Sequence, residues 1–337
     1  GSFERLRLHL PPIAGVRPIA PAAAFGSNTV LIDASRSQEQ VQRMPLLPGD
    51  KVWISVRRIH ALVHPGLSFV ILSDGSPAAK VTLAAAGQIA RLAHARTTIL
   101  GIMPAGVERE RFQAELRDQV GSGLPSLEAR TAQGAPAELL QAELERRPHD
   151  LVVLSDRPGI EDIAAQLLQT GEHHLLLMPA SQQVPERVRV CVAAGEPGKD
   201  DVRFAGRLIR HLEAGVTLMT VLPPGSSATT RQRAERFLEA GVRTLELLGL
   251  QAETVIRHGS VRQEIDRELR ENQHDMLVLG VPLPSPAWHD VLPGVVGQIV
   301  GEHQNRPVLL VRSREAIVRA TRVSGPARIR VDEEVLR

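Results

Sequence analysis

Short apolar runs alternate with amphipathic stretches along most of the chain beyond residue 66. Leu151–Leu154 and Met276–Leu279 are apolar at every position, which is typical of parallel strands that are buried on both faces. Leu140 and Leu144 belong to an intervening stretch in which apolar residues recur at helical spacing. Strands that alternate with helices predict right-handed crossovers and a doubly wound parallel sheet. Ligands of such a sheet bind beyond the carboxyl ends of its strands.

This pattern occurs twice along the chain. Val188–Gly195 repeats the apolar run and polar turn of Phe69–Ser76 after 119 residues. Further matches follow at offsets of 120, 125 and 133 residues, and this rising order indicates one repeated unit with small insertions in the second copy. We therefore predict two α/β domains, at residues 67–182 and 183–314.

The first 66 residues alternate apolar and polar positions instead of following a helical period. The segments FERLRLHL, NTVLID and DKVWISVRR have this alternation, and Pro48-Gly49 and Pro65-Gly66 predict turns. Residues 1–66 are therefore predicted to form a small β-domain. Residues 315–337 form a tail of mixed charge.

The composition limits the classes of function. The 337 residues include 40 basic and 38 acidic side chains, a formal net charge of +2, and the basic residues do not cluster, which argues against a nucleic-acid partner. Cys191 is the single cysteine, so an intrachain disulfide and a cysteine-rich zinc site are excluded. No apolar run approaches the ~20 residues that span a bilayer, and charges occupy the region where a signal peptide has its apolar core. We expect a cytoplasmic protein without membrane insertion.

The two α/β copies resemble the universal stress protein family, arranged in tandem. The resemblance rests on Asp74-Gly75-Ser76 after the first strand, on the segment Gly259–Gly280 that ends in LVLG, and on the closing strand PVLLVR. It implies two flavodoxin-like domains, and a nucleotide site in those members that bind ATP. It also implies association through the last strands, so that His174–Met178 and Val308–Arg312 would pair as an internal pseudo-dimer. A homodimer of whole chains is a further option.

The first copy departs from the pattern of the ATP-binding members. Those members share a strand-end Asp and a glycine loop, G-x2-G-x9-G-[S/T], before the last helix. The first copy has the acid in Asp74-Gly75-Ser76, but its segment after Ser155 is eight residues shorter than in the second copy. Glu161 and Asp162 then align with the third glycine position and the hydroxyl position of the loop. Two carboxylates at a helix N-terminus would occupy the anion site that a triphosphate needs.

The second copy departs in a complementary way. Gly280, Gly294 and Gly297 remain as candidate loop glycines, but Leu283 stands at the second glycine position, and Ala193 stands where the first copy has its acid. Prolines, which have no N–H to offer a phosphate, crowd the same loop. The glycines of this copy and Asp74, Gly75, Ser76 and Ser155 of the first are therefore candidate residues of two degenerate nucleotide sites. We expect no bound cofactor, and ATP is the one ligand that the resemblance allows.

The segment Leu46–Gly66 resembles the transport-associated OB module that follows the ATPase domain of many ABC importers. The resemblance rests on L-x-P-G-D and on the alternating Val, Trp, Ile and Val that follow it, while a potassium-channel regulatory subdomain would show a similar Pro-Gly-Asp turn. It implies an OB-like domain, a transporter subunit as partner, and a chain that is the C-terminal regulatory part of an importer ATPase. The phosphate-binding motif of the motor itself, G-x-x-x-x-G-K-[ST], is absent from the sequence.

Several other polar residues have structural interpretations that we prefer. His149-Asp150 and His274-Asp275 each precede a buried strand, where an Asp hydrogen-bonded to the backbone of a turn is a better account than a metal site. Cys191 lies mid-strand and is expected to be a small buried hydrophobe. His173-His174 is expected to be either an exposed pair or a pair with a specific role. Trp288 either covers an apolar edge or belongs to a loop that has become a partner contact or a lid.

No catalytic constellation is evident in the sequence, so we predict that the protein is not an enzyme, or at most a weak ATPase. We predict a non-catalytic regulatory or stress-response protein that is associated with a transporter. An importer ATPase fragment that senses a ligand or an oxyanion, and an ATP-binding stress switch, are the two alternatives.

Overall fold

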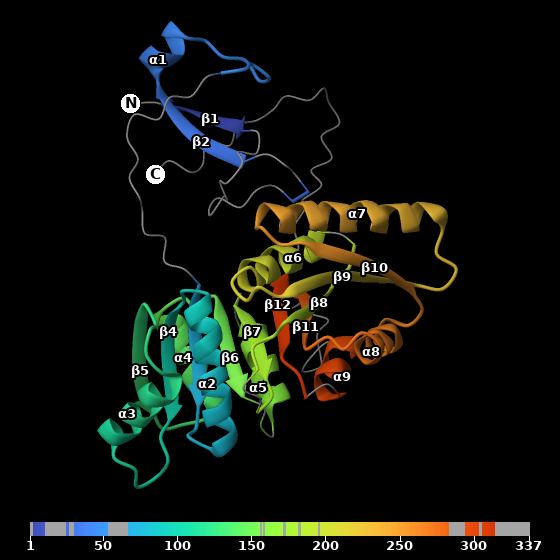
Figure 1. Ribbon diagram of the computed structural model, residues 1–337. Coiled ribbons are helices and arrows are strands. Elements are labelled where there is room, and N and C mark those ends of the chain that lie inside the picture. Colours follow the sequence, from blue (N-terminus) through green and yellow to red (C-terminus); the bar gives the residue numbers. More distant parts are fainter. Residues whose placement is uncertain are drawn as a thin grey trace.

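The computed structural model describes residues 3–10, 25–26, 30–52, 67–155, 157, 159–170, 173–180, 183–194, 196–282, 294–302 and 305–313. These residues form a ten-stranded sheet with helices on both of its faces and a separate two-stranded hairpin (Figure 1). Among the described residues, no helix combines the length and apolar character that crossing a bilayer requires.

The first half of the sheet contains five of the strands. They are β3 (Ser68–Ser73), β4 (Arg96–Ile102), β5 (Ser126–Ala132), β6 (Leu151–Ser155) and β7 (His174–Met178). The helices described between them are α2 (Pro77–Leu92), α3 (Arg109–Val120), α4 (Pro136–Arg146) and α5 (Ile160–Thr170).

The second half repeats this order of elements. Its strands are β8 (Arg187–Cys191), β9 (Gly215–Leu222), β10 (Ala252–His258), β11 (Met276–Pro282) and β12 (Val308–Ser313). The helices described between them are α6 (Glu196–Ile209), α7 (Ala228–Leu247), α8 (Val261–Glu271) and α9 (Gly294–Glu302).

The strand order across the sheet is β10-β9-β8-β11-β12-β7-β6-β3-β4-β5. Neighbouring strands are parallel within each half, which confirms the predicted α/β fold with a largely parallel sheet. The central pair differs, because β12 and β7 run antiparallel, with Val308–Leu310 opposite Leu175–Leu177. The strands of the two halves therefore run in opposite directions, so their carboxyl ends lie on opposite sides of the sheet, measured along the strands.

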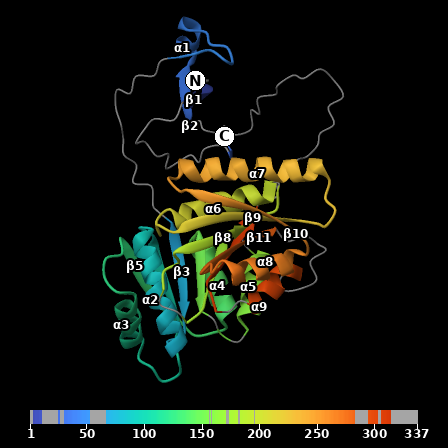
Figure 2. The ribbon, with the colours of Figure 1, turned by 45° about the vertical axis from the view of Figure 1, so that its right-hand side comes forward.

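Two apolar layers enclose the sheet. Residues of α2, α3, α6 and α7 form the core on one face, and residues of α4, α5, α8 and α9 form the core on the other (Figure 2). The apolar runs at β6 and β11 supply side chains to both layers, as expected for strands that helices cover on both sides.

The junction between the halves contains the histidine pair at the start of β7. His173 is 9% exposed, and the Nδ1 atom of His174 accepts a hydrogen bond from the backbone N–H of Arg312 at 2.9 Å. The His174 ring also packs against Phe204 of α6, with 3.6 Å between ring centroids. An exposed pair is therefore the wrong interpretation, since His173 is buried and His174 contacts the second half.

The N-terminal residues are described only in part. β1 (Phe3–Leu10) and β2 (Val30–Ser37) form an antiparallel pair that α1 (Gln38–Arg43) follows, so these two segments are strands. Residues 53–66, which hold most of the OB-like pattern, lie outside the described residues, as do Trp288 and the tail 315–337. The OB-like domain and the transporter association that it implies gain no further support from the described structure.

One turn of the N-terminal segment docks on the second half. The Phe25 ring lies 5.1 Å from that of Phe237 on α7. Gly26 donates its N–H to Oγ1 of Thr244 at 2.9 Å and accepts a bond from Nε of Arg243 at 3.1 Å. Its φ of +72° favours glycine, and a Cβ at this position would lie 2.6 Å from Cβ of Ala240.

Candidate functional site

The first strand of the first half ends in a polar turn. The Asp74 carboxylate accepts a hydrogen bond from the N–H of Ser76 at 3.0 Å, and Oγ of Ser76 caps α2 by accepting one from the N–H of Ala79 at 3.2 Å. Gly75 has a φ of +74°, and a Cβ there would lie 2.7 Å from the ring of Phe112. The three residues therefore form a turn and a helix cap at the edge where a ligand would enter.

The Asp74 carboxylate is paired with a cation from the neighbouring strand end. Arg157 lies two residues beyond β6 and places Nη1 3.3 Å from Oδ2 of Asp74. Burial acts to raise the pKa of Asp74, but hydrogen bonds from Ser76 and the charge of Arg157 outweigh it, so the pKa lies below its ordinary value. The negative charge that would face a ligand is therefore neutralised by the chain itself.

The loop that follows β6 leads into an acidic helix end. Ser155 is buried as the last residue of β6, and Glu161 and Asp162 lie in the first turn of α5. Acidic side chains are favourable at this end of a helix because they complement its dipole. They oppose a phosphate at the same place, at about 1 to 4 kcal/mol for each pair of charges ~4 Å apart.

The second half carries a buried carboxylate in the corresponding region. Asp201 of α6 is 2% exposed and packs on Gly280 of β11. A Cβ at residue 280 would lie 2.7 Å from Oδ1 of Asp201 and closer still to Oδ2. Residue 193 is an alanine and offers no acid, but α6, the helix that follows it, places the carboxylate of Asp201 beside Gly280, the first candidate loop glycine.

Sequence reasoning missed Asp201, because no spacing rule connects a helix residue to a strand glycine far along the chain. The available signal was an acid on the apolar face of α6, beside Val202 and Ala205. α9 begins at Gly294, and Gly297 lies in its first turn, so both candidate glycines belong to a helix. Residues 283–293 of the candidate loop, Leu283 included, lie outside the described residues.

The structure does not bring the two sets of candidate residues together. Asp74, Gly75, Ser76 and Ser155 lie at the carboxyl ends of β3 and β6, which are neighbours in the first half. Gly280 lies at the carboxyl end of β11, and β11 ends at the opposite edge of the sheet because of the antiparallel junction. One ligand therefore cannot contact both sets.

The histidine–aspartate pairs are structural turns, as predicted. Asp150 accepts a hydrogen bond from the N–H of Ser68 at 2.8 Å, and Asp275 accepts one from the N–H of Arg187 at 2.8 Å. Among the described residues, no three His, Cys, Asp or Glu side chains are grouped as a metal ion would require. Burial raises the pKa of the Cys191 thiol to about 12, so this side chain has no thiolate character at neutral pH.

Comparisons with known proteins agree with this fold. Residues 185–312 match the model of the universal stress protein family. A solved universal stress protein from Archaeoglobus fulgidus has a TM-score of 0.56 and 11% identity over 73% of this chain and 98% of its own. A protein of unknown function from Pseudomonas aeruginosa PAO1 has a TM-score of 0.54 and 15% identity over 74% of this chain and 93% of its own. No curated protein sequence matches the chain.

At these identities the structural likeness concerns the fold alone, and it extends over both halves of the sheet. The family match covers the second half, with the buried Asp201 and Gly280 inside it. Residues 185–312 thus form a domain that matches the universal stress protein family, within an α/β sheet that has the fold of a solved universal stress protein.

Proposed function

We propose that the chain is a non-catalytic regulatory protein built from two universal stress protein-like domains in tandem, at residues 67–182 and 183–314. Each domain has a degenerate nucleotide site, and the protein responds to a ligand or a partner rather than turning over a substrate. The shared strand order of the two halves supports the tandem arrangement. The family match of the second half supports a common origin.

One observation supports the loss of nucleotide binding more than any other. The chain fills the ligand-facing edge of each half with its own charges. In the first half Arg157 pairs with Asp74, and two carboxylates lie at the start of α5. In the second half the carboxylate of Asp201 packs on Gly280. A triphosphate would have to break an ion pair or approach carboxylates, and both changes disfavour binding.

Titration calorimetry with ATP and Mg²⁺ on the whole chain tests this proposal. We expect a flat trace, and no release of phosphate above that of buffer in a hydrolysis assay. Saturable binding in the micromolar range, at either half, would overturn the proposal.

Variants of the first half sharpen the test. Removing the acids of α5 in Glu161→Gln/Asp162→Asn, together with the pairing cation in Arg157→Ala, is expected to raise the affinity for ATP into a measurable range. Glu138→Gln removes an exposed acid from the first turn of α4 and serves as the matched control, with no expected gain. Equal affinities in the triple variant and the control would show that these charges do not exclude the nucleotide.

A second candidate function is an ATP-responsive switch. It is favoured by the position of Asp74, which lies at a strand end with 28% of its side chain exposed. The same calorimetric trace separates the two functions, because a switch requires binding in the unmodified chain.

A further inference from the structure

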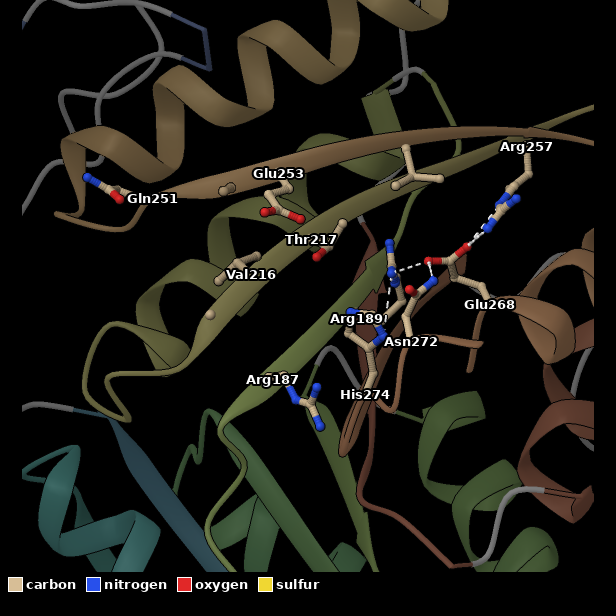
Figure 3. Close-up of a pocket in the computed structure, with 13 residues that line it drawn as sticks. Arg187, Arg189, Val216, Thr217, Gln251, Glu253, Arg257, Glu268, Asn272 and His274 are labelled. Carbon is tan, nitrogen blue, oxygen red and sulfur yellow. Dashed lines mark hydrogen bonds and ion pairs between the residues drawn. The ribbon is translucent and has the colours of Figure 1, made fainter. Parts of the chain in front are cut away.

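A pocket lies at the amino ends of the strands of the second half, opposite to the carboxyl ends where Gly280 lies. It has a volume of about 640 Å³ and begins at the amino ends of β8, β9 and β10. Buried side chains form its floor and exposed ones its rim. The floor is lined by Arg189, Thr217, Glu268 and His274, and the rim includes Arg187 and Glu253 (Figure 3).

The floor of the pocket contains an arginine with unused donors. Arg189 is 2% exposed, and its Nη2 donates to Glu268 and, at 3.4 Å, to Nδ1 of His274. Its Nε and Nη1 atoms have no hydrogen-bond partner in the described part of the chain. Buried donors without an acceptor are rare, and a guanidinium keeps its charge in a protein. The neighbouring residues therefore supply no acceptor for these two donors of Arg189.

The lining of this pocket carries three arginines and two glutamates. Glu268 is shared, because Nε of Arg257 also donates to it at 2.8 Å. Glu268 therefore faces two guanidinium groups, of which that of Arg257 also contacts Glu271, with 3.1 Å between Nη2 and Oε2. Burial and the nearby Arg189 lower the pKa of His274 to about 4, so this imidazole is neutral and its Nδ1 accepts the bond from Arg189. Arg187 adds a third cation at the rim, and Glu253 adds a second carboxylate.

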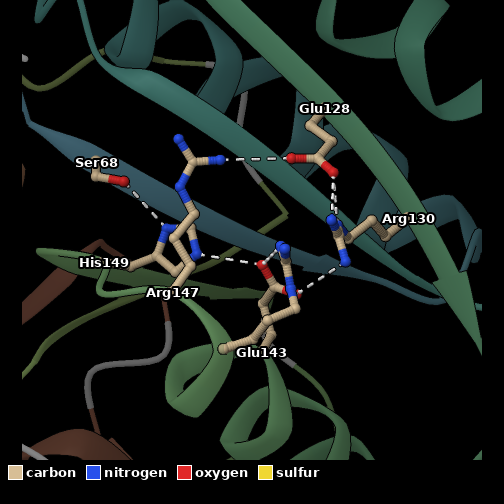
Figure 4. Close-up of polar contacts among 7 residues, drawn as sticks. Ser68, Glu128, Arg130, Glu143, Arg147 and His149 are labelled. Carbon is tan, nitrogen blue, oxygen red and sulfur yellow. Dashed lines mark hydrogen bonds and ion pairs between the residues drawn. The ribbon is translucent and has the colours of Figure 1, made fainter.

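The first half contains the same framework without the buried cation. Glu143 is buried at the end of α4, where Arg146 contacts it at 2.6 Å and Nε2 of His149 lies at 3.4 Å (Figure 4). The ring also lies 3.1 Å from Oγ of Ser68. Val70, which is fully buried, occupies the position that Arg189 has in the second half. The fold therefore does not require a guanidinium at this position, because the first half has a valine there.

We propose that this pocket binds the carboxylate of a small organic anion, with Arg189 as the buried counter-charge and Arg187 as the cation at the entrance. Each unused N–H of the Arg189 guanidinium can donate a charge-assisted hydrogen bond to one oxygen of a carboxylate. With Glu271 beside Arg257, the arginines and glutamates of this cluster balance, so a ligand with one negative charge is disfavoured less than a ligand with two. This proposal is independent of the nucleotide sites, which lie at other strand ends.

Arginine side-chain NMR on the whole chain tests the proposal with fragments as probes. The Nε–H signal of Arg189 is assigned by its loss in Arg189→Val, the residue that the first half carries. We expect acetate and butyrate to shift this signal saturably, whereas acetamide leaves it unchanged. The Arg187→Gln variant, at an exposed position, should weaken the affinity roughly 3- to 10-fold.

Two controls define the outcomes. Arg130→Gln alters the corresponding cluster of the first half and should leave the titration of Arg189 unchanged. The absence of a saturable shift with either carboxylate would overturn the proposal. Tighter binding of inorganic phosphate than of acetate would also overturn it, because the charge balance then fails to select a carboxylate.

Discussion

The contact between Gly280 and Asp201 yields a quantitative prediction about stability. In Gly280→Ala, the added Cβ would overlap the carboxylate, since Oδ1 of Asp201 lies 2.7 Å from the position of that atom. Ordinary Cβ contacts begin near 3.4 Å, so the buried side chain of Asp201 has to move. Overpacking of this kind costs about 1 to 3 kcal/mol.

A double-mutant cycle isolates the clash. Unfolding by urea, followed by circular dichroism, gives the free energy of Gly280→Ala alone and in the background of Asp201→Ala. We expect the cost at position 280 to fall by at least about 1 kcal/mol once the carboxylate is absent. Gly215→Ala is the matched control, because its nearest atom would be 3.8 Å away, and it should change stability by less than about 0.5 kcal/mol. An equal cost of Gly280→Ala in both backgrounds would refute the reasoning.

Three further predictions concern the docked turn, a buried histidine and the buried acids. Gly26→Ala should release its turn from α7, visible as faster hydrogen exchange in that helix, because the φ of +72° and the close approach both exclude a side chain. Burial lowers the pKa of His173 to about 4. The free energy of unfolding should therefore be highest above about pH 6.5 and fall by roughly 2 to 4 kcal/mol as the pH drops toward 4. His173→Gln should flatten this part of the pH–stability curve. Glu268→Gln should cost about 3 to 5 kcal/mol in urea unfolding, because it leaves the buried Arg189 without its carboxylate partner. Glu143→Gln should cost clearly less, because the arginine partners of Glu143, Arg130 and Arg146, are partly exposed. Equal costs would contradict the role assigned to burial.

Much of the sheet could be predicted from local pattern. Leu151–Leu154 and Met276–Leu279 are apolar throughout because helices cover both of their faces, and that requirement can be recognised in single strands. The repeat offsets predicted that both halves would have the same elements, and the structure has the same strand order in each. The aspartates at the helix-to-strand turns were predicted to bind backbone, but the N–H groups that they bind, those of Ser68 and Arg187, belong to neighbouring strands far away along the chain.

The polar residues of the core could not be predicted in this way. Asp201 meets Gly280 only because α6 crosses β11, and this contact depends on packing between distant segments. His173 precedes a strand like many exposed residues, but the folded chain buries it. Arg189 did leave a signal that sequence reasoning overlooked: a charged residue stands inside a strand whose position between two helical layers demands apolar side chains.

The antiparallel pairing of β7 with β12 also limits how the ten-stranded sheet can pair with a further copy of the chain. β7 and β12 would be exposed edge strands if the two halves formed separate sheets, but here they pair with each other. The edge strands of the described ten-stranded sheet are β5 and β10. These two carry mostly solvent-facing or half-covered side chains, with charges at Glu128, Arg130, Glu253 and Arg257. Charged borders discourage sheet extension. Within the described ten-stranded sheet, the backbone hydrogen bonds between β7 and β12 join the two halves, so neither strand can pair with a further copy of the chain.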